Sequence, residues 1–186
     1  MRDYHETLAG GPWDCIIADF PWAYTQGITH ATQKELVPYP TLVDPLDFFT
    51  AAYVALVPDR NLWVWSDWYT LPRLLLAAQQ VGFTYRGLCV VKRRNLGLGY
   101  LLRKQIYFLP LWSKGKAYRN PDAWLSEYLG DYRCPRSHKP PEVYQRLLAH
   151  SLPPGGRWID PFPATHTDMP RHPLPERMSL WPICER

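Results

Sequence analysis

A carboxylate, a proline and an aromatic ring follow one another in the stretch Asp19-Phe20-Pro21-Trp22. The Asp19 carboxylate can accept a hydrogen bond from an amine, and the Phe20 carbonyl can accept the second hydrogen of the same amine. Pro21 restricts Phe20 to extended conformations, and the Trp22 ring offers a stacking surface for a planar heterocycle. These residues predict a loop that recognises an exocyclic amino group on a stacked base. The alternatives are a turn cap for Asp19 and a core position for Trp22.

Two apolar segments are needed to position this chemistry. Residues 14–18 predict a short buried strand that ends at Asp19. Residues 157–162 predict another strand, which runs into a second corner at Asp160-Pro161-Phe162. Because ligands of open parallel sheets bind beyond the carboxyl ends of the strands, we expect both corners on the same edge of one sheet.

Strands and helices alternate along the rest of the chain, which predicts an α/β fold with a largely parallel sheet. Asp44 is the expected N-cap of one helix, with Pro45 at its first position and Pro58 at its end; Gly82 is the expected C-cap of the next. Pro110 predicts an edge strand or a bulge. Helices are expected at 44–59, at 67–82 and from about Pro141, further strands at 61–66, 84–92 and 105–113, and irregular segments at 25–43 and 114–136.

The composition is that of one domain, residues 1–186, with 46% hydrophobic and 20% charged residues. No apolar run approaches the roughly 18 residues of a membrane helix, and the first residues contain no hydrophobic leader, so we expect a cytoplasmic protein without a membrane partner. The four cysteines are scattered and form no C-x-x-C pair, which favours free thiols over a zinc site or disulfides.

Positive charge gathers in the middle of the chain. The net charge is +4, and basic residues concentrate at 91–95 and 101–105, followed by Lys114, Lys116 and Arg119. A phosphate-facing surface needs such a cluster, although an ordinary solvated surface has the same composition. Nine tryptophans and twelve tyrosines are enough to supply base-stacking rings as well as a core.

The stretch Asp19 to Trp22 resembles the D-P-P-W or D-P-P-Y motif of S-adenosylmethionine-dependent amino-methyltransferases. The similar branch is the N6-adenine methyltransferases related to the catalytic subunit of the messenger-RNA N6-adenosine methyltransferase. The likeness covers most of the chain from Trp13 to Phe162, and its motifs occur in the order of that branch. They are WDCIIADFPWAY (13–24), VPYPTL (37–42), NLWVWS (61–66), VGFTYRGLCVVKRRN (81–95), GLGYLLRKQIYFLPLWSKGK (97–116) and SHKPPEVYQRL (137–147).

This resemblance implies a Rossmann-like methyltransferase fold in permuted order, with the catalytic motif first and the cofactor strand last. It implies methyl transfer from S-adenosylmethionine to the N6 amine of adenine in nucleic acid, DNA rather than RNA, as in phage or restriction-linked modification. It implies no metal, and it leaves room for a homodimer or heterodimer. The implied catalytic residues are Asp19, Phe20, Pro21 and Trp22; cofactor-binding residues are Asp19, Lys139, Asp160, Phe162, His166, Thr167 and Glu185; substrate-binding residues are Tyr39, Arg103 and Lys104.

Several of these roles have plainer alternatives. Lys139, implied to lie near the methionine carboxylate of the cofactor, stands just before a helix, where lysines are usually solvated. Tyr39 is a pocket wall or a packing residue, and Arg103 and Lys104 are nucleic-acid contacts or plain surface residues. Short loops at 25–36 and 114–136, or a partner, are expected to choose the target sequence.

The chain departs from the family pattern in four places. Phe20 replaces the first proline of the motif, and no glycine pair follows Phe162. The strand that ends the family domain is reduced to ERMSLWPICER, where Glu185 matches poorly, and Tyr107 replaces an acidic residue. Residues 168–186 are expected to form an irregular, proline-rich tail. The intact Asp19 favours an active enzyme, whereas the altered cofactor end favours an impaired relative that binds nucleic acid or partners an active subunit; a methyltransferase acting on RNA or a small nucleotide is a third alternative.

Overall fold

The computed structural model describes residues 4–19, 44–96, 103, 105–132 and 139–162. They form a six-stranded sheet in the order β5-β3-β4-β2-β1-β6. β1 is parallel to β2 and β6, β3 is parallel to β5, and β4 is antiparallel to β2 and β3. Five strands of this sheet therefore point one way and β4 points the other, which confirms the expected largely parallel α/β fold. The strands are β1 (Trp13–Ala18), β2 (Leu56–Val64), β3 (Thr84–Arg93), β4 (Ile106–Lys114), β5 (Tyr128–Tyr132) and β6 (Trp158–Ile159).

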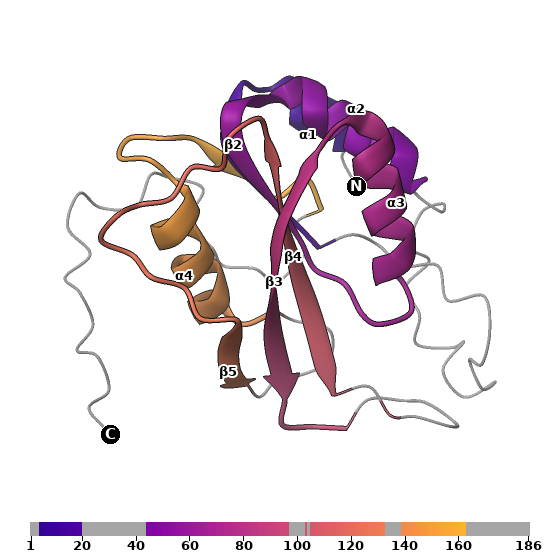
Figure 1. Cartoon of the computed structure of the whole chain (residues 1–186), viewed down its shortest axis with the longest axis vertical. Helices are drawn as coiled ribbons and strands as arrows, with labels where there is room; N and C mark the ends of the chain where they lie inside the picture. The colour runs from indigo at the N-terminus through magenta and orange to yellow at the C-terminus, as the bar shows by residue number, and fades with distance from the viewer. Residues whose placement is uncertain (1–3, 20–43, 97–102, 104, 133–138, 163–186) are drawn as a thin grey trace.

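Helices cover both faces of the sheet (Figure 1). α1 (Tyr4–Ala9), α2 (Pro45–Ala55) and α3 (Leu71–Val81) lie on one face, and α4 (Pro141–Ser151) lies on the other. Alternate residues of the central strands enter the two cores, as the pleat of a strand requires. Ile16, Ala18, Leu62 and Val64 pack with α1 to α3, whereas Cys15, Ile17, Trp63 and Trp65 pack with α4.

The expected start of α2 is confirmed, and its expected end at Pro58 is wrong. The Asp44 side chain accepts a hydrogen bond from the Leu46 N–H at 3.1 Å, which caps the helix. The helix ends at Ala55 because Leu56 already has extended backbone and begins β2. Lys114 on β4 donates to the carbonyls of Tyr53 and Leu56 at 2.7 and 2.8 Å, so it satisfies acceptors that the helix end leaves free.

α3 starts later than expected and ends where expected. Residues 67–70 form a turn held by the Asp67 side chain, and the helix begins only at Leu71. Its C-cap is Gly82 with a φ of 103°, a left-handed conformation that glycine adopts without steric cost.

Pro110 does not mark an edge strand, because β4 lies between β3 and β2 in the middle of the sheet. Pairing of β4 with β2 reaches Trp63↔Leu111 and resumes at the bridge Ser66↔Phe108. Pro110 lies between these two pairs, at a position where β4 is not paired with β2. Its missing N–H therefore breaks no hydrogen bond between these two strands.

Three further elements differ from the sequence expectations. β5 lies inside the segment expected to be irregular; it contains Gly130 with a φ of 116° and shows no hydrophobic alternation. α1 was not expected at all, and the strand expected at 157–162 is reduced to Trp158–Ile159. These elements are short. The positions of β5 and β6 depend on pairing with β3 and β1, and α1 packs against α2.

Candidate active site

Asp19 and Asp160 leave the sheet at the same edge, as the sequence predicts. β1 and β6 are adjacent and parallel, with Cys15 opposite Trp158 and Ile16 opposite Ile159. The carboxylates also share a face of the sheet. Ala18 and Ile159 pack on the side of α1 to α3, so the residue after each is expected on the α4 side. The contacts of both carboxylates agree with this placement on the α4 side. Asp19 contacts Lys139, just before α4, and Asp160 contacts Tyr144, in the first turns of α4.

Lys139 forms a buried ion pair with Asp19. Its ammonium donates to both carboxylate oxygens at 2.7 Å, and only 6% of the Lys139 side chain and 17% of the Asp19 side chain are exposed. Burial lowers the pKa of Lys139, but the charge of Asp19, with help from Tyr107 and Asp160, outweighs it and raises the pKa above its ordinary value. The lysine is therefore a fixed cation on the expected catalytic carboxylate, which excludes a solvated position for Lys139.

Two aromatic rings enclose this cation. The Lys139 ammonium lies 5.0 Å from the centre of the Tyr107 ring and 5.4 Å from that of Trp65, both within the range of cation–π attraction. The Arg93 guanidinium lies 5.5 Å from the Tyr107 ring as well. Tyr107 therefore has a cationic environment at the position where the resembled family has an acid. Sequence reasoning missed Trp65, although its alternation with Trp63 in NLWVWS places both on the α4 face.

Asp160 is held by neighbouring donors. Its carboxyl accepts from the Tyr144 hydroxyl at 3.0 Å and from the Phe162 N–H at 2.9 Å. Burial and then the charge of Asp19 raise the pKa of Asp160 to about 7. Burial and the charge of Asp160 raise the pKa of Tyr144, so the phenol stays protonated and donates. Phe162 packs against Tyr4, with ring centres 5.3 Å apart.

The raised pKa of Asp160 predicts a pH-dependent stability. A carboxyl that titrates at about 7 in the folded state and at 3.8 in the unfolded state keeps its proton better when folded. The folded state loses this advantage as the pH rises through that window, by at most about 4 kcal/mol. Between pH 5 and 8, the free energy of unfolding should therefore fall more for the wild type than for Asp160→Asn. Urea titrations at both pH values measure this difference, and parallel pH profiles would contradict it.

The basic residues of the middle of the chain separate onto opposite edges. β3 runs parallel to β1, so Lys92, Arg93 and Arg94 lie at the carboxyl edge together with Asp19. Lys114, at the end of the antiparallel β4, lies at the other edge and caps α2. Only the first group can face a substrate bound at Asp19. Arg103 is exposed.

Eight of the sequence-predicted site residues lie outside the described part of the chain. The irregular tail expected at 168–186 lies outside it too. The eight residues are Phe20, Pro21, Trp22, Tyr39, Lys104, His166, Thr167 and Glu185.

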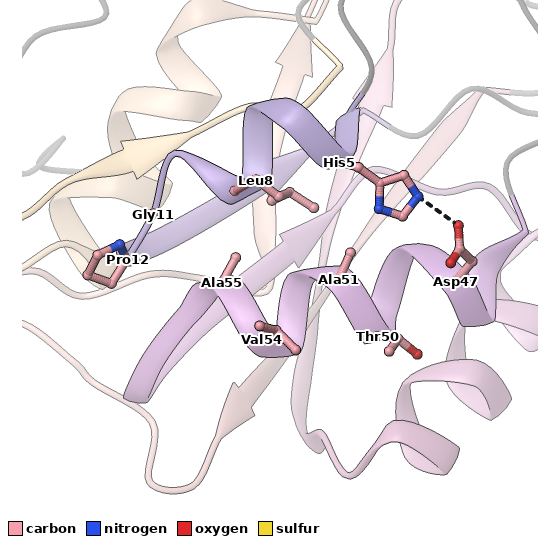
Figure 2. Close-up of a pocket in the computed structure, with 10 residues that line it drawn as sticks. His5, Leu8, Gly11, Pro12, Asp47, Thr50, Ala51, Val54 and Ala55 are labelled. Carbon is pink, nitrogen blue, oxygen red and sulfur yellow. Dashed lines mark hydrogen bonds and ion pairs between the residues drawn. The ribbon is translucent and has the colours of Figure 1, made fainter.

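A groove of about 570 Å³ runs between α1 and α2 (Figure 2), and neither Asp19 nor Asp160 lines it. Its walls include Leu8, Ala51 and Val54, and His5 contacts Asp47 at one end. Within the described ranges, no cluster of three or more His, Cys, Asp or Glu side chains has the arrangement of a metal site. None of the helices in those ranges is long and apolar enough to span a bilayer. The described cysteines, Cys15 and Cys89, are free and buried.

Searches with protein-family models and with curated protein sequences found no match to the chain. Solved structures do share its fold. M1.HpyAVI in complex with SAM superposes with a TM-score of 0.62 at 14% identity, over 87% of this chain and 79% of that one. TTHA0409 of Thermus thermophilus, assigned as a DNA modification methylase, gives 0.62 at 16% identity over 87% and 78%. Its complex with S-adenosyl-L-methionine gives 0.58 at 16% identity over 86% and 76%. The chain therefore has the Rossmann-like methyltransferase fold.

Proposed function

We propose that this chain transfers a methyl group from S-adenosylmethionine to the exocyclic N6 amine of adenine in DNA. The observation that carries the proposal is the Asp19 carboxylate, 17% exposed, at the carboxyl end of β1, beside Asp160 and in contact with the buried Lys139. The likeness of the fold to M1.HpyAVI, solved with SAM, and to TTHA0409, assigned as a DNA modification methylase, supports methyl transfer to DNA. We further propose a single cytoplasmic domain related to the messenger-RNA N6-adenosine methyltransferases, with a role in phage or restriction-linked modification.

The reaction needs an amine whose lone pair is free. In adenine that lone pair is delocalised into the ring, which makes the N6 amine a poor nucleophile. Hydrogen bonds from its two N–H groups to Asp19 and to the Phe20 carbonyl would favour a tetrahedral nitrogen, while Trp22 stacks on the base. When bound, the cofactor would supply a methyl group on a positively charged sulfur, and the electrons of the carbon–sulfur bond would return to sulfur as the nitrogen takes that methyl group. Asp19 stabilises the cationic nitrogen and is placed to accept the proton it loses.

The donor set at the site fits one end of the cofactor. The amino-acid end of S-adenosylmethionine carries an ammonium and a carboxylate, and the ion pair offers a carboxylate on Asp19 and an ammonium on Lys139. Exchange of this internal pair for two pairs with the cofactor would keep every buried charge neutralised. Asp160, Phe162, His166, Thr167 and Glu185 are proposed to complete the cofactor site, and Tyr39, Arg103 and Lys104 to contact the substrate.

A second candidate function rests on the same ion pair. Because Lys139 donates to both oxygens of Asp19, an amine substrate must compete with it for the carboxylate. If the pair never opens, the chain is an impaired relative that binds nucleic acid or partners an active subunit in a dimer.

Calorimetric titration with S-adenosylmethionine tests the proposal. We expect saturable binding below millimolar cofactor, and weaker binding of 5′-methylthioadenosine, which lacks the amino-acid end. Lys139→Met should bring the two ligands closer in affinity, because it removes the proposed carboxylate contact. A wild-type protein that gives no binding signal at millimolar S-adenosylmethionine would exclude the enzyme and leave the second candidate.

A further inference from the structure

Two adjacent aromatic side chains project from the turn that follows β2. Trp68 is 50% exposed and Tyr69 is 41% exposed. Their rings meet edge to face, with centres 5.7 Å apart and planes at 88°. Large exposed apolar surfaces are costly for a folded protein, and contiguous ones often mark a binding site.

The turn that carries the rings is fixed by buried polar groups. Asp67 is 1% exposed, and its carboxylate accepts from the N–H groups of Tyr69 and Thr70 and from the Thr70 hydroxyl, each at 2.9 Å. Just before it, Ser66 exchanges backbone hydrogen bonds with Phe108 on the central strand β4. The backbone under both rings is therefore anchored to the sheet, so ordering this turn would add little entropic cost to binding.

The rings lie at the same edge of the sheet as Asp19. The backbone N–H of Trp65 donates to the Ala18 carbonyl at 2.8 Å. Trp65 therefore lies beside Ala18, the residue before Asp19. Trp68 follows three residues later, which limits its distance from Trp65 to about 11 Å. At that distance, the Trp68 ring can contact the nucleotides next to a base that is held at Asp19.

Positively charged side chains near the rings indicate that the ligand is a nucleic acid. Arg73 is exposed on the first turn of α3, directly after the aromatic turn. Arg94 is exposed directly after β3, at the same edge of the sheet, whereas the nearby Lys92 is paired with Asp131. Aromatic rings beside cations are the combination with which proteins bind the bases and phosphates of an unpaired strand.

We propose that Trp68 and Tyr69 form a stacking platform for unpaired bases beside the target nucleotide, so that the protein takes an unpaired stretch of nucleic acid. The inference rests on the proposed function only for the identity of the target base. In a duplex the faces of internal bases are stacked on each other and closed to side chains, whereas an open strand presents them. Stacking tolerates every base, so the platform binds DNA and RNA strands by the same chemistry.

Fluorescence anisotropy with labelled single-stranded DNA, single-stranded RNA and duplex DNA of one sequence tests the platform. Trp68→Ala and Tyr69→Ala should each raise the Kd for unpaired strands roughly tenfold, with little effect on the duplex. The matched control is Tyr85→Ala, since this side chain is 49% exposed but lies at the start of β3, at the opposite edge of the sheet. The control should bind as the wild type does.

Equal Kd values for wild type and platform variants, an equal loss in the Tyr85→Ala control, or a loss confined to duplex DNA would each overturn the inference. Calorimetry with S-adenosylmethionine on the same variants separates it from the proposed function, because Trp68 and Tyr69 are not among the residues proposed to bind the cofactor. Loss of strand binding with no cofactor binding in any protein would support the platform and refute the methyltransferase. Normal cofactor binding with unchanged strand binding would refute the platform alone.

Discussion

Replacing Asp19 with asparagine should lower methyl transfer by at least about 100-fold at saturating cofactor and nucleic acid. Asparagine keeps an acceptor oxygen of the same shape, but it loses the negative charge that we propose stabilises a cationic nitrogen and the basicity that we propose takes its proton. Turnover per folded molecule, measured with labelled methyl groups, gives the size of the effect.

Asp14→Asn is the matched control for this variant. Asp14 lies on the same strand, and its carboxylate also holds a cation, with Arg60 at 3.0 Å, but it lies at the opposite end of β1. We expect its turnover to equal that of the wild type. A similar loss in both variants would assign the effect to the strand, and full activity of Asp19→Asn would show that the catalytic role belongs to another group.

The ion pair itself should give the largest effect on stability. Lys139→Met leaves the Asp19 carboxylate without its cation, and Asp19→Asn leaves a lysine that is only 6% exposed without its anion. Removing one partner of a buried pair costs about 3–5 kcal/mol, whereas replacing both partners with neutral groups is often close to neutral. The double variant should therefore be more stable than either single variant.

A double-mutant cycle in urea measures this coupling. The free energies of unfolding of the wild type, both single variants and the double variant give the interaction between the two side chains. The charge-paired Lys92–Asp131 contact, 3.3 Å long and partly exposed, is the control pair. Its cycle should give no more than about 1 kcal/mol. Additive losses at Asp19 and Lys139 would mean that the two charges do not depend on each other in the folded protein.

The placement of Asp19 and Asp160 at one edge of the sheet could be predicted because it depends on local sequence patterns. Residues 14–18 and 157–162 each show an apolar run that stops at an aspartate, and parallel strands end at one edge. The alternation in NLWVWS also predicts that Trp63 and Trp65 point to the same face of the sheet, although this prediction was not made from the sequence. A period of two and a strand end are properties of a few neighbouring residues.

The contacts between these elements were not predictable in the same way. Lys139 meets Asp19 across 120 positions of the chain, and the contact depends on how α4 docks on the sheet. The carbonyls at the end of α2 are satisfied by Lys114, which comes from β4. Pro110 has the sequence signature of an edge strand or a bulge, yet β4 lies inside the sheet. Proline is tolerated there because the pairing with β2 skips its position. Each of these contacts involves a residue or strand that is distant in the sequence, so a pattern read from neighbouring residues cannot predict it.

The central claim is methyl transfer to the N6 amine of adenine, and one measurement tests it most directly. The protein is incubated with methyl-labelled S-adenosylmethionine and unpaired or duplex DNA and RNA, and the nucleic acid is then digested and its nucleosides separated. We predict that the label co-migrates with the N6-methylated adenine nucleoside of DNA, and that Asp19→Asn yields almost none of it. Label in a cytosine nucleoside, or no label in any nucleoside from a wild-type protein that binds the cofactor, would contradict the claim.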